Sequence, residues 1–155
     1  MDHPTFAQLL GNYGEFLGAI AVAVTLIYLA GQLRQNTRAL RSTSYAHWNE
    51  IASTWSDFLA EHAEELSEIE AKVDLDELSL EQQKIYLAFA LKSYTQAETG
   101  YLLHRAGTLD EDFFVARMDQ FEEFLNRTPL MRQAFQLVAP LTDSFTQFLR
   151  GRGLI

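Results

Sequence analysis

The hydrophobic positions begin with one uninterrupted apolar run close to the N-terminus. From Phe16 to Leu33 the chain has eighteen residues without a charge, and its polar interruptions are Thr25, Tyr28 and Gln32. A helix of this length is about 27 Å long, close to the ~30 Å hydrocarbon core of a bilayer. The pattern therefore predicts a membrane-spanning helix at residues 16–33, preceded by an N-terminal segment at residues 1–15.

Two other kinds of segment share this pattern. A cleaved signal peptide needs a basic segment before the run and small residues around the cut, whereas here the preceding segment is acidic and the bulky Leu29 occupies one of those positions. A core helix of a soluble protein is also apolar, and eighteen residues lie near the lower limit for a span. The arginines that begin where the run ends favour the membrane-spanning helix.

Three arginines, Arg34, Arg38 and Arg41, directly follow the run, while residues 1–33 contain no Lys or Arg. Because positive residues beside a span stay in the cytoplasm, we expect the N-terminus outside and residues 34–155 in the cytoplasm. The spacing of three and four places the arginines on one helical face. That face is a candidate site for anionic lipid headgroups, and a solvated basic face is the alternative.

Small and polar residues form a stripe along one face of the apolar run. Their positions step alternately by four and three, and they are Gly14, Gly18, Ala21, Thr25, Tyr28 and Gln32. Small residues let two helices approach closely in lipid, and hydroxyl or amide groups hydrogen-bond across such a contact. We expect this stripe to be a helix-association face through which copies of the chain assemble.

Beyond the arginines the apolar positions keep a helical period. They are Leu40, Tyr45, Trp48, Ile51, Trp55, Phe58, Leu59, Leu66 and Ile69, which predicts one helix running unbroken out of the membrane. Helix starts are predicted at Ser79 by a capping box with Gln82, at Thr108 or Asp110, and at Thr128 before Pro129.

Glycines and one further proline mark the ends of these helices. Gly107 and Gly151 are expected helix ends, and Pro140 separates off a last short helix that includes Leu141 and Phe145. No period-two strand pattern occurs in the sequence. The expected fold is all-α, with the transmembrane helix continuing into a four- to five-helix soluble bundle at residues 34–155.

Charge and composition exclude several function classes. The 155 residues carry 12 Lys and Arg against 21 Asp and Glu, and this acidic balance disfavours a nucleic-acid partner. Because the chain has no cysteine, disulfides, thiolate nucleophiles and cysteine-ligated metals are excluded. Ten acids and one lysine in residues 57–81 give that segment a local charge of −9, equal to the net charge of the chain. We interpret it as a solvated face, with docking of a basic partner as the alternative.

Few residues are candidates for chemistry. Glu98 and His104 lie six apart, which is off the spacing for one helical face, so no metal site and no cofactor is expected. Arg41 and His47, with five residues between them, match the very loose pattern of HEPN ribonucleases. The aromatic residues, Trp48 and Trp55 among them, suggest either a ligand cage or a packed core, and their helical spacing favours the core.

Two segments carry a resemblance to a family of small bacterial single-pass membrane proteins without an assigned activity. The first begins at Tyr28 and includes Arg34-Gln35-Asn36-Thr37-Arg38-Ala39-Leu40-Arg41, and the second is Glu98-x2-Tyr101-x2-His104-x2-Gly107-x-Leu109-Asp110. The resemblance covers most of the chain and implies one span, a helical cytoplasmic domain, and no substrate or cofactor. Phe114 and Phe135 stand where this family has Trp, which bears on packing alone.

The expected function is therefore a non-enzymatic one. We expect an inner-membrane module that binds itself or an unidentified protein, with the lipid bilayer as its environment and no nucleic acid as a partner. An alternative from another class is a homo-oligomeric membrane pore or defence accessory effector, which resembles in architecture alone the small membrane proteins of RNA-targeting CRISPR systems. A membrane-tethered HEPN-like nuclease is the third interpretation.

Overall fold

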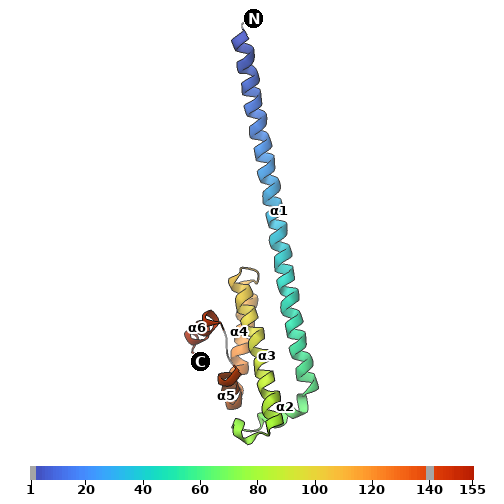
Figure 1. Cartoon of the computed structure of the whole chain (residues 1–155), viewed down its shortest axis with the longest axis vertical. Coiled ribbons are helices and arrows are strands. Elements are labelled where there is room, and N and C mark those ends of the chain that lie inside the picture. Colours follow the sequence, from blue (N-terminus) through green and yellow to red (C-terminus); the bar gives the residue numbers. More distant parts are fainter. Residues whose placement is uncertain (1–2, 139–141) are drawn as a thin grey trace. The chain divides into compact units, whose positions relative to one another are not determined.

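A computed structural model describes residues 3–138 and 142–155, and these residues form an all-α fold, as predicted (Figure 1). No strand occurs among them. The helices are α1 (His3–Glu61), α2 (Ala63–Glu70), a 3₁₀ turn η1 (Leu75–Glu77), α3 (Leu80–Arg105), α4 (Glu111–Asn126), α5 (Pro129–Val138) and α6 (Asp143–Gly151). Pro140 and Leu141, which were expected to begin the last helix, lie outside the described residues.

The chain forms two compact units, residues 1–40 and residues 41–155, and α1 contributes to both. The first unit consists of the apolar part of α1. From Leu10 to Leu40 every side chain is exposed. This helix is long and apolar enough to cross a membrane.

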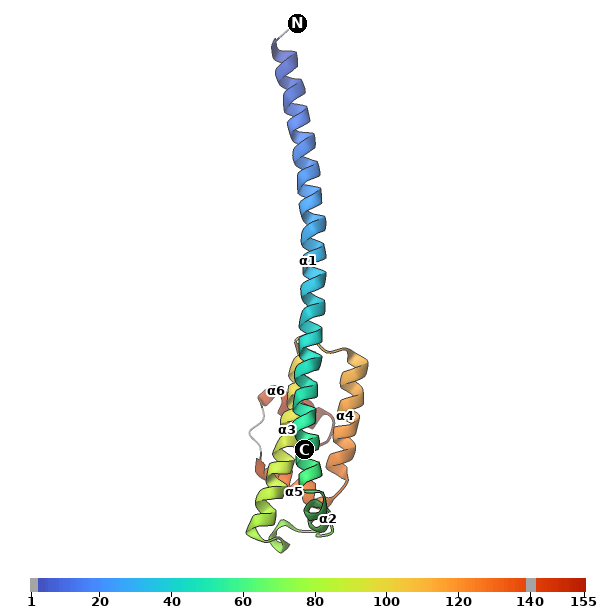
Figure 2. The same ribbon diagram turned by 90° about the vertical axis from the view of Figure 1, so that its right-hand side faces the viewer.

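The second unit is built in three layers (Figure 2). Helices α3 and α4 form the middle layer, with residues 41–61 of α1 on one side and α5 and α6 on the other. Side chains from α2, α3, α4, α5 and α6 fill its core, and the largest fully buried ones are Ile69, Tyr86, Phe89, Tyr94, Met118, Leu130, Met131, Phe145 and Leu149. Burial of these apolar side chains is the main source of stability, because the unit has no disulfide to supplement it.

The helix boundaries follow the local signals in the sequence. Ser79 accepts a hydrogen bond from the backbone of Gln82, and the Gln82 side chain accepts one in return, which confirms the predicted capping box. The Thr128 hydroxyl accepts from the backbone N–H of Met131, and α5 begins at Pro129 as predicted. Gly107 ends the α3 turn with a φ of 73°, in the left-handed region that glycine adopts without strain.

One predicted boundary is wrong. The helix that was expected to run unbroken past residue 61 stops at Glu61, and α2 begins after the single non-helical residue His62. Backbone hydrogen bonds still join His62 to Phe58 (3.1 Å) and Leu66 to His62 (2.8 Å). The period of the apolar positions therefore continues through the break, which is why the sequence pattern does not show it.

Candidate functional site

The predicted helix-association stripe lies on the exposed surface of α1. Around Gly14 and Gly18, no atom lies within 4 Å of the place that a Cβ would take, so the backbone is open to close approach there. The polar members bond within the helix: the Thr25 hydroxyl donates to the Ala21 carbonyl, and the Gln32 amide donates to the Tyr28 hydroxyl. Because these donors already have partners, the stripe has two possible environments, lipid and a second helix.

The three predicted headgroup residues divide into two groups. Arg34 and Arg38 are exposed and make no ion pair with any described residue. Arg41 instead reaches Asp110, 3.2 Å away, at the start of α4. The lipid-headgroup hypothesis therefore rests on Arg34 and Arg38, while Arg41 has a partner within its own unit.

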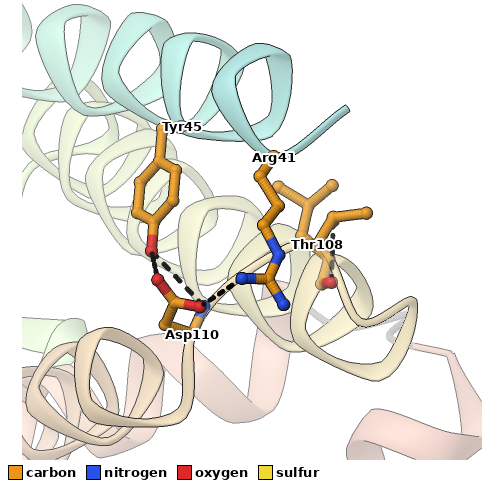
Figure 3. A network of polar contacts seen from close by, with 5 residues as sticks. Arg41, Tyr45, Thr108 and Asp110 are labelled. Carbon is orange, nitrogen blue, oxygen red and sulfur yellow. Dashed lines mark hydrogen bonds and ion pairs between the residues drawn. The ribbon is translucent and has the colours of Figure 1, made fainter. Parts of the chain in front are cut away.

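Asp110 joins α1 to the loop between α3 and α4 (Figure 3). The Tyr45 hydroxyl donates to its second carboxylate oxygen at 2.9 Å, while Arg41 approaches the first. Asp110 occupies the N-cap position of α4, as one of the two predicted caps, yet its side chain makes no capping hydrogen bond. The other candidate, Thr108, donates its hydroxyl to the Leu103 carbonyl. An aspartate at the N-cap normally accepts a hydrogen bond from a backbone N–H in the first turn of its helix. The Asp110 carboxylate instead connects the start of α4 to α1.

The segment from Glu98 to Asp110 carries part of the family resemblance. Several of its side chains connect α3 to neighbouring helices. Glu98 accepts from the backbone N–H of Thr142 at 2.7 Å, and the Tyr101 hydroxyl donates to the Ser144 carbonyl at 3.1 Å. His104 stacks on Phe114 and places Nε2 3.2 Å from Glu111. Each of these side chains links α3 to the start of α6 or α4, so this segment has a structural role in the second unit.

Two tryptophans on α1 pack against small residues on α3. Trp48 lies over Gly100, and the Trp55 indole N–H donates to the Ser93 hydroxyl at 2.9 Å. The two tryptophans are seven residues apart on α1, and their partners are seven residues apart on α3 in the reverse order. This is the arrangement that an antiparallel helix pair requires. The predicted core role of the tryptophans is therefore observed: Trp48 is 7% exposed, and Trp55 packs against the core.

The same tryptophans, for which a ligand cage was the less favoured alternative, also line a groove. The groove has a volume of about 1020 Å³ and is lined by α1, α3 and α4. Its apolar walls include Trp48, Trp55, Phe113, Met118, Phe121 and Phe124. A volume of this size lies at the upper end of the range for small-molecule sites, about 300–1,000 Å³.

Arg117 on α4 is the distinctive polar residue of this groove. Its guanidinium carbon lies 5.1 Å from the ring centres of both Trp48 and Phe113, and Nη1 donates to Gln120 at 2.6 Å. Its Nε atom is buried and has no hydrogen-bond partner among the described residues. Nor does any described carboxylate form an ion pair with it. A cation partly removed from water and without a counter-ion favours the binding of an anion.

The other charged side chains of the groove are differently placed. Arg127 lies at the far end of α4 and forms an ion pair with Glu70 at 3.5 Å. Glu123 also lines the groove and is exposed to solvent. Because Arg127 already has a carboxylate partner, Arg117 is the cation whose charge is left for a ligand.

The predicted chemistry residues stay apart. Arg41 pairs with Asp110, whereas His47 lies 3.8 Å from Glu50 on the same helix. Glu98 and His104 likewise bond to different elements, and the described residues contain no group of three potential metal ligands. The residue that sequence reasoning missed is Arg117. The sequence feature that could have identified it is a cation within the apolar stripe of α4, between Phe114 and Phe121.

Two buried tyrosines, Tyr86 and Tyr94, have hydroxyl groups whose pKa is raised. Burial raises the pKa of Tyr86 to about 12, although its hydroxyl lies 3.2 Å from that of Thr128. Burial also raises the pKa of Tyr94, with a smaller contribution from the nearby Glu98 carboxylate. The Tyr94 hydroxyl has no hydrogen-bond partner among the described residues. Both groups are neutral over the ordinary pH range and belong to the core of the unit.

Comparison with known proteins gives no relationship from which to transfer a function: no protein-family model, curated protein or solved structure matches the chain.

Proposed function

We propose that the chain is a single-pass inner-membrane protein whose helical unit, residues 41–155, is a non-enzymatic binding module. The observation that carries the proposal is the uniformly exposed apolar surface of α1 from Phe16 to Leu33. An apolar surface of this extent is unfavourable in water, and a bilayer removes it from water. A helix satisfies its own backbone hydrogen bonds, as the hydrocarbon core demands.

The proposed orientation places the N-terminus outside and residues 41–155 in the cytoplasm. Support comes from Arg34 and Arg38, which follow the apolar segment directly and are exposed for contact with lipid phosphates. The acidic residues of 57–81 lie far from this boundary along the chain. They do not count against the orientation, because acidic residues contribute little to the positive-inside rule.

The absence of cysteine makes a direct test simple. Asn12→Cys and Arg150→Cys place one thiol on each side of the proposed span. In bacterial spheroplasts, a membrane-impermeant maleimide should label the Asn12 variant at once and the Arg150 variant only after lysis. The reverse order overturns the orientation. Release of the protein by alkaline carbonate, which strips peripheral proteins, overturns the span itself.

Self-association through the stripe is the second part of the proposal. Its support is the open surface around Gly14 and Gly18, where a neighbouring helix has room to approach. Light scattering with the detergent contribution subtracted measures the mass of the complex. Ala21→Leu should reduce that mass. Ala23→Leu is a matched control, because residue 23 lies about 200° around the helix from residue 21.

The alternative function, a homo-oligomeric pore or defence accessory effector, depends on the same measurement. A defined ring of subunits that conducts ions in a planar bilayer would support the pore. If the wild type and Ala23→Leu are both monomeric, the pore is excluded, and the binding module remains as the proposed function. The nuclease interpretation gains no support from the geometry, because Arg41 and His47 each have a separate carboxylate partner.

A further inference from the structure

The groove between α1, α3 and α4 combines three features of a ligand site. Its walls are aromatic, its volume is about 1020 Å³, and Arg117 lines it without a carboxylate partner among the described residues. Small-molecule sites are typically apolar cavities with a few polar groups that fix the orientation of the ligand. These features define the chemistry of the occupant more closely than the apolar surface alone.

The charge of the occupant follows from Arg117. Its guanidinium carbon lies 5.1 Å from the ring centres of Trp48 and Phe113, and its Nε atom is buried without a hydrogen-bond partner among the described residues. An anion bound in the groove would compensate the charge of this guanidinium, because no described carboxylate forms an ion pair with it. A carboxylate matches the planar arrangement of guanidinium donors. The chain as a whole carries a net charge of −9, so this unpaired cation in an apolar groove is a local exception.

The shape of the occupant follows from the length of the groove. Along α4 and its C-cap the lining extends from Phe113 to Arg127, fourteen residue steps or about 21 Å. From Arg117 towards Asn126 the groove continues for about 14 Å, past Phe121 and Phe124. A long flexible chain fits such a groove better than a compact ring system. The glutamate in this stretch, Glu123, is exposed to solvent.

We propose that this groove binds a free long-chain fatty acid, with its carboxylate on Arg117 and its alkyl chain along α4 between the tryptophans and phenylalanines. The proposal concerns residues 41–155 alone and does not depend on whether residues 16–33 cross a membrane. We favour the free acid over a bilayer phospholipid, because one arginine without a carboxylate partner matches one carboxylate and because every lining residue belongs to residues 41–155, outside the apolar segment.

Both tryptophans of the chain line the groove, so intrinsic fluorescence reports on its occupancy. The full-length protein is placed in phosphatidylcholine discs, and its co-elution with the discs is recorded first. Failure to co-elute would count against the proposed membrane span. In that case the binding experiment is carried out on the same protein in solution. Stearate with bromine atoms in mid-chain is then titrated as the quencher.

We expect saturable quenching by the brominated acid and a dissociation constant at least tenfold weaker for its methyl ester, which lacks the anionic head. This comparison uses the wild-type protein and does not depend on the folding of any variant. Equal binding of acid and ester would overturn the role of Arg117, and absence of saturable quenching would overturn the site. Brominated phosphatidylcholine in the discs should leave the fluorescence unchanged. Quenching by it to the same extent would overturn the free acid as the source.

Variants then locate the site. Arg117→Gln retains most of the side-chain length and removes the charge, and we expect it to weaken binding of the acid about ten- to a hundredfold. Arg150→Gln is the matched control, because Arg150 lies on α6 and does not line the groove. Ala52→Phe fills part of the groove and should weaken acid and ester alike. An Arg117→Gln variant that binds the acid as tightly as the control would overturn the proposal.

Discussion

The indole Nε1 atom of Trp48 lies 3.3 Å from the point that a Cβ atom of residue 100 would occupy. Contacts of this length are tighter than nine in ten real Cβ contacts, so a side chain at residue 100 would force the Trp48 ring to shift by a few tenths of an ångström. Such a shift would disturb the edge-on contact of the ring with Phe113 at 5.2 Å and the position of Arg117, whose guanidinium carbon lies 5.1 Å from the ring centre. The glycine thus sets how closely α1 packs against α3.

Gly100→Leu should destabilise residues 41–155 by about 1–3 kcal/mol, because a larger side chain overpacks the interface and displaces Trp48. Urea unfolding followed by tryptophan fluorescence measures the effect, since both tryptophans lie in this unit. Gly151→Leu is the control. No atom lies within 4 Å of a Cβ there, so its effect should stay within about 0.5 kcal/mol. Equal effects of the two variants would show that the Trp48 contact is unimportant.

The Asp110 network should show two interactions of different character. Arg41 and Asp110 are 49% and 57% exposed, so their coupling in a double-mutant cycle should be below about 1 kcal/mol and decrease with salt. Tyr45→Phe combined with Asp110→Asn should give a coupling of about 0.5–1.5 kcal/mol that depends less on salt, because Tyr45 is a neutral donor. A salt-independent coupling of Arg41 to Asp110 would contradict this interpretation.

Removal of the two buried tyrosine hydroxyls should change the stability of residues 41–155 in opposite directions. Tyr94→Phe removes a buried hydroxyl without a partner among the described residues and should be neutral or stabilising by up to about 1 kcal/mol. Tyr86→Phe breaks the hydrogen bond with Thr128 and should destabilise by about 0.5–1.5 kcal/mol. The two substitutions remove the same atom from the same helix, so each controls for the other. A clear loss of stability in Tyr94→Phe would indicate a partner for its hydroxyl.

Stability should fall in alkaline solution, because Tyr86 loses its hydroxyl proton at a lower pH in the unfolded chain than in the folded protein. Burial raises the pKa of Tyr86 from 10.0 to about 12 in the folded protein, so between these pH values the unfolded chain loses a proton that the folded chain keeps. The contribution is fully present below pH 10 and decreases by about 1.4 kcal/mol per pH unit up to the folded pKa. The stability advantage of the wild type over Tyr86→Phe should therefore shrink and then reverse in sign between pH 10 and 12, measured by urea unfolding with circular dichroism. A constant difference would contradict the raised pKa.

Local signals were sufficient for the helix start at Ser79, for the end of α3 before Gly107 and for the apolar segment. The capping box at Ser79 and the left-handed Gly107 involve residues within one or two turns of each other, so neighbouring side chains decide them. The exposed apolar surface of α1 follows directly from the uncharged run between Phe16 and Leu33. Composition fixed the lack of disulfides in the same direct way.

Longer-range relationships needed the tertiary structure. Arg41 and Asp110 are 69 positions apart, and each was assigned a local role, as a lipid-headgroup residue and as a helix cap. Which of several arginines meets a given carboxylate depends on how α1 packs against the α3–α4 loop. The break at His62 escaped notice for a related reason, because it leaves the apolar period unchanged.

The sequence by itself determined an all-α chain with one apolar N-terminal helix, because hydrophobic period, charge and caps are properties of consecutive residues. Only the tertiary structure decided that Trp48 and Trp55 both pack against α3 and line a groove, and that Arg117 lies in it without a carboxylate partner among the described residues. A groove is formed by three helices that are distant in sequence, and whether a cation is paired depends on every side chain brought near it.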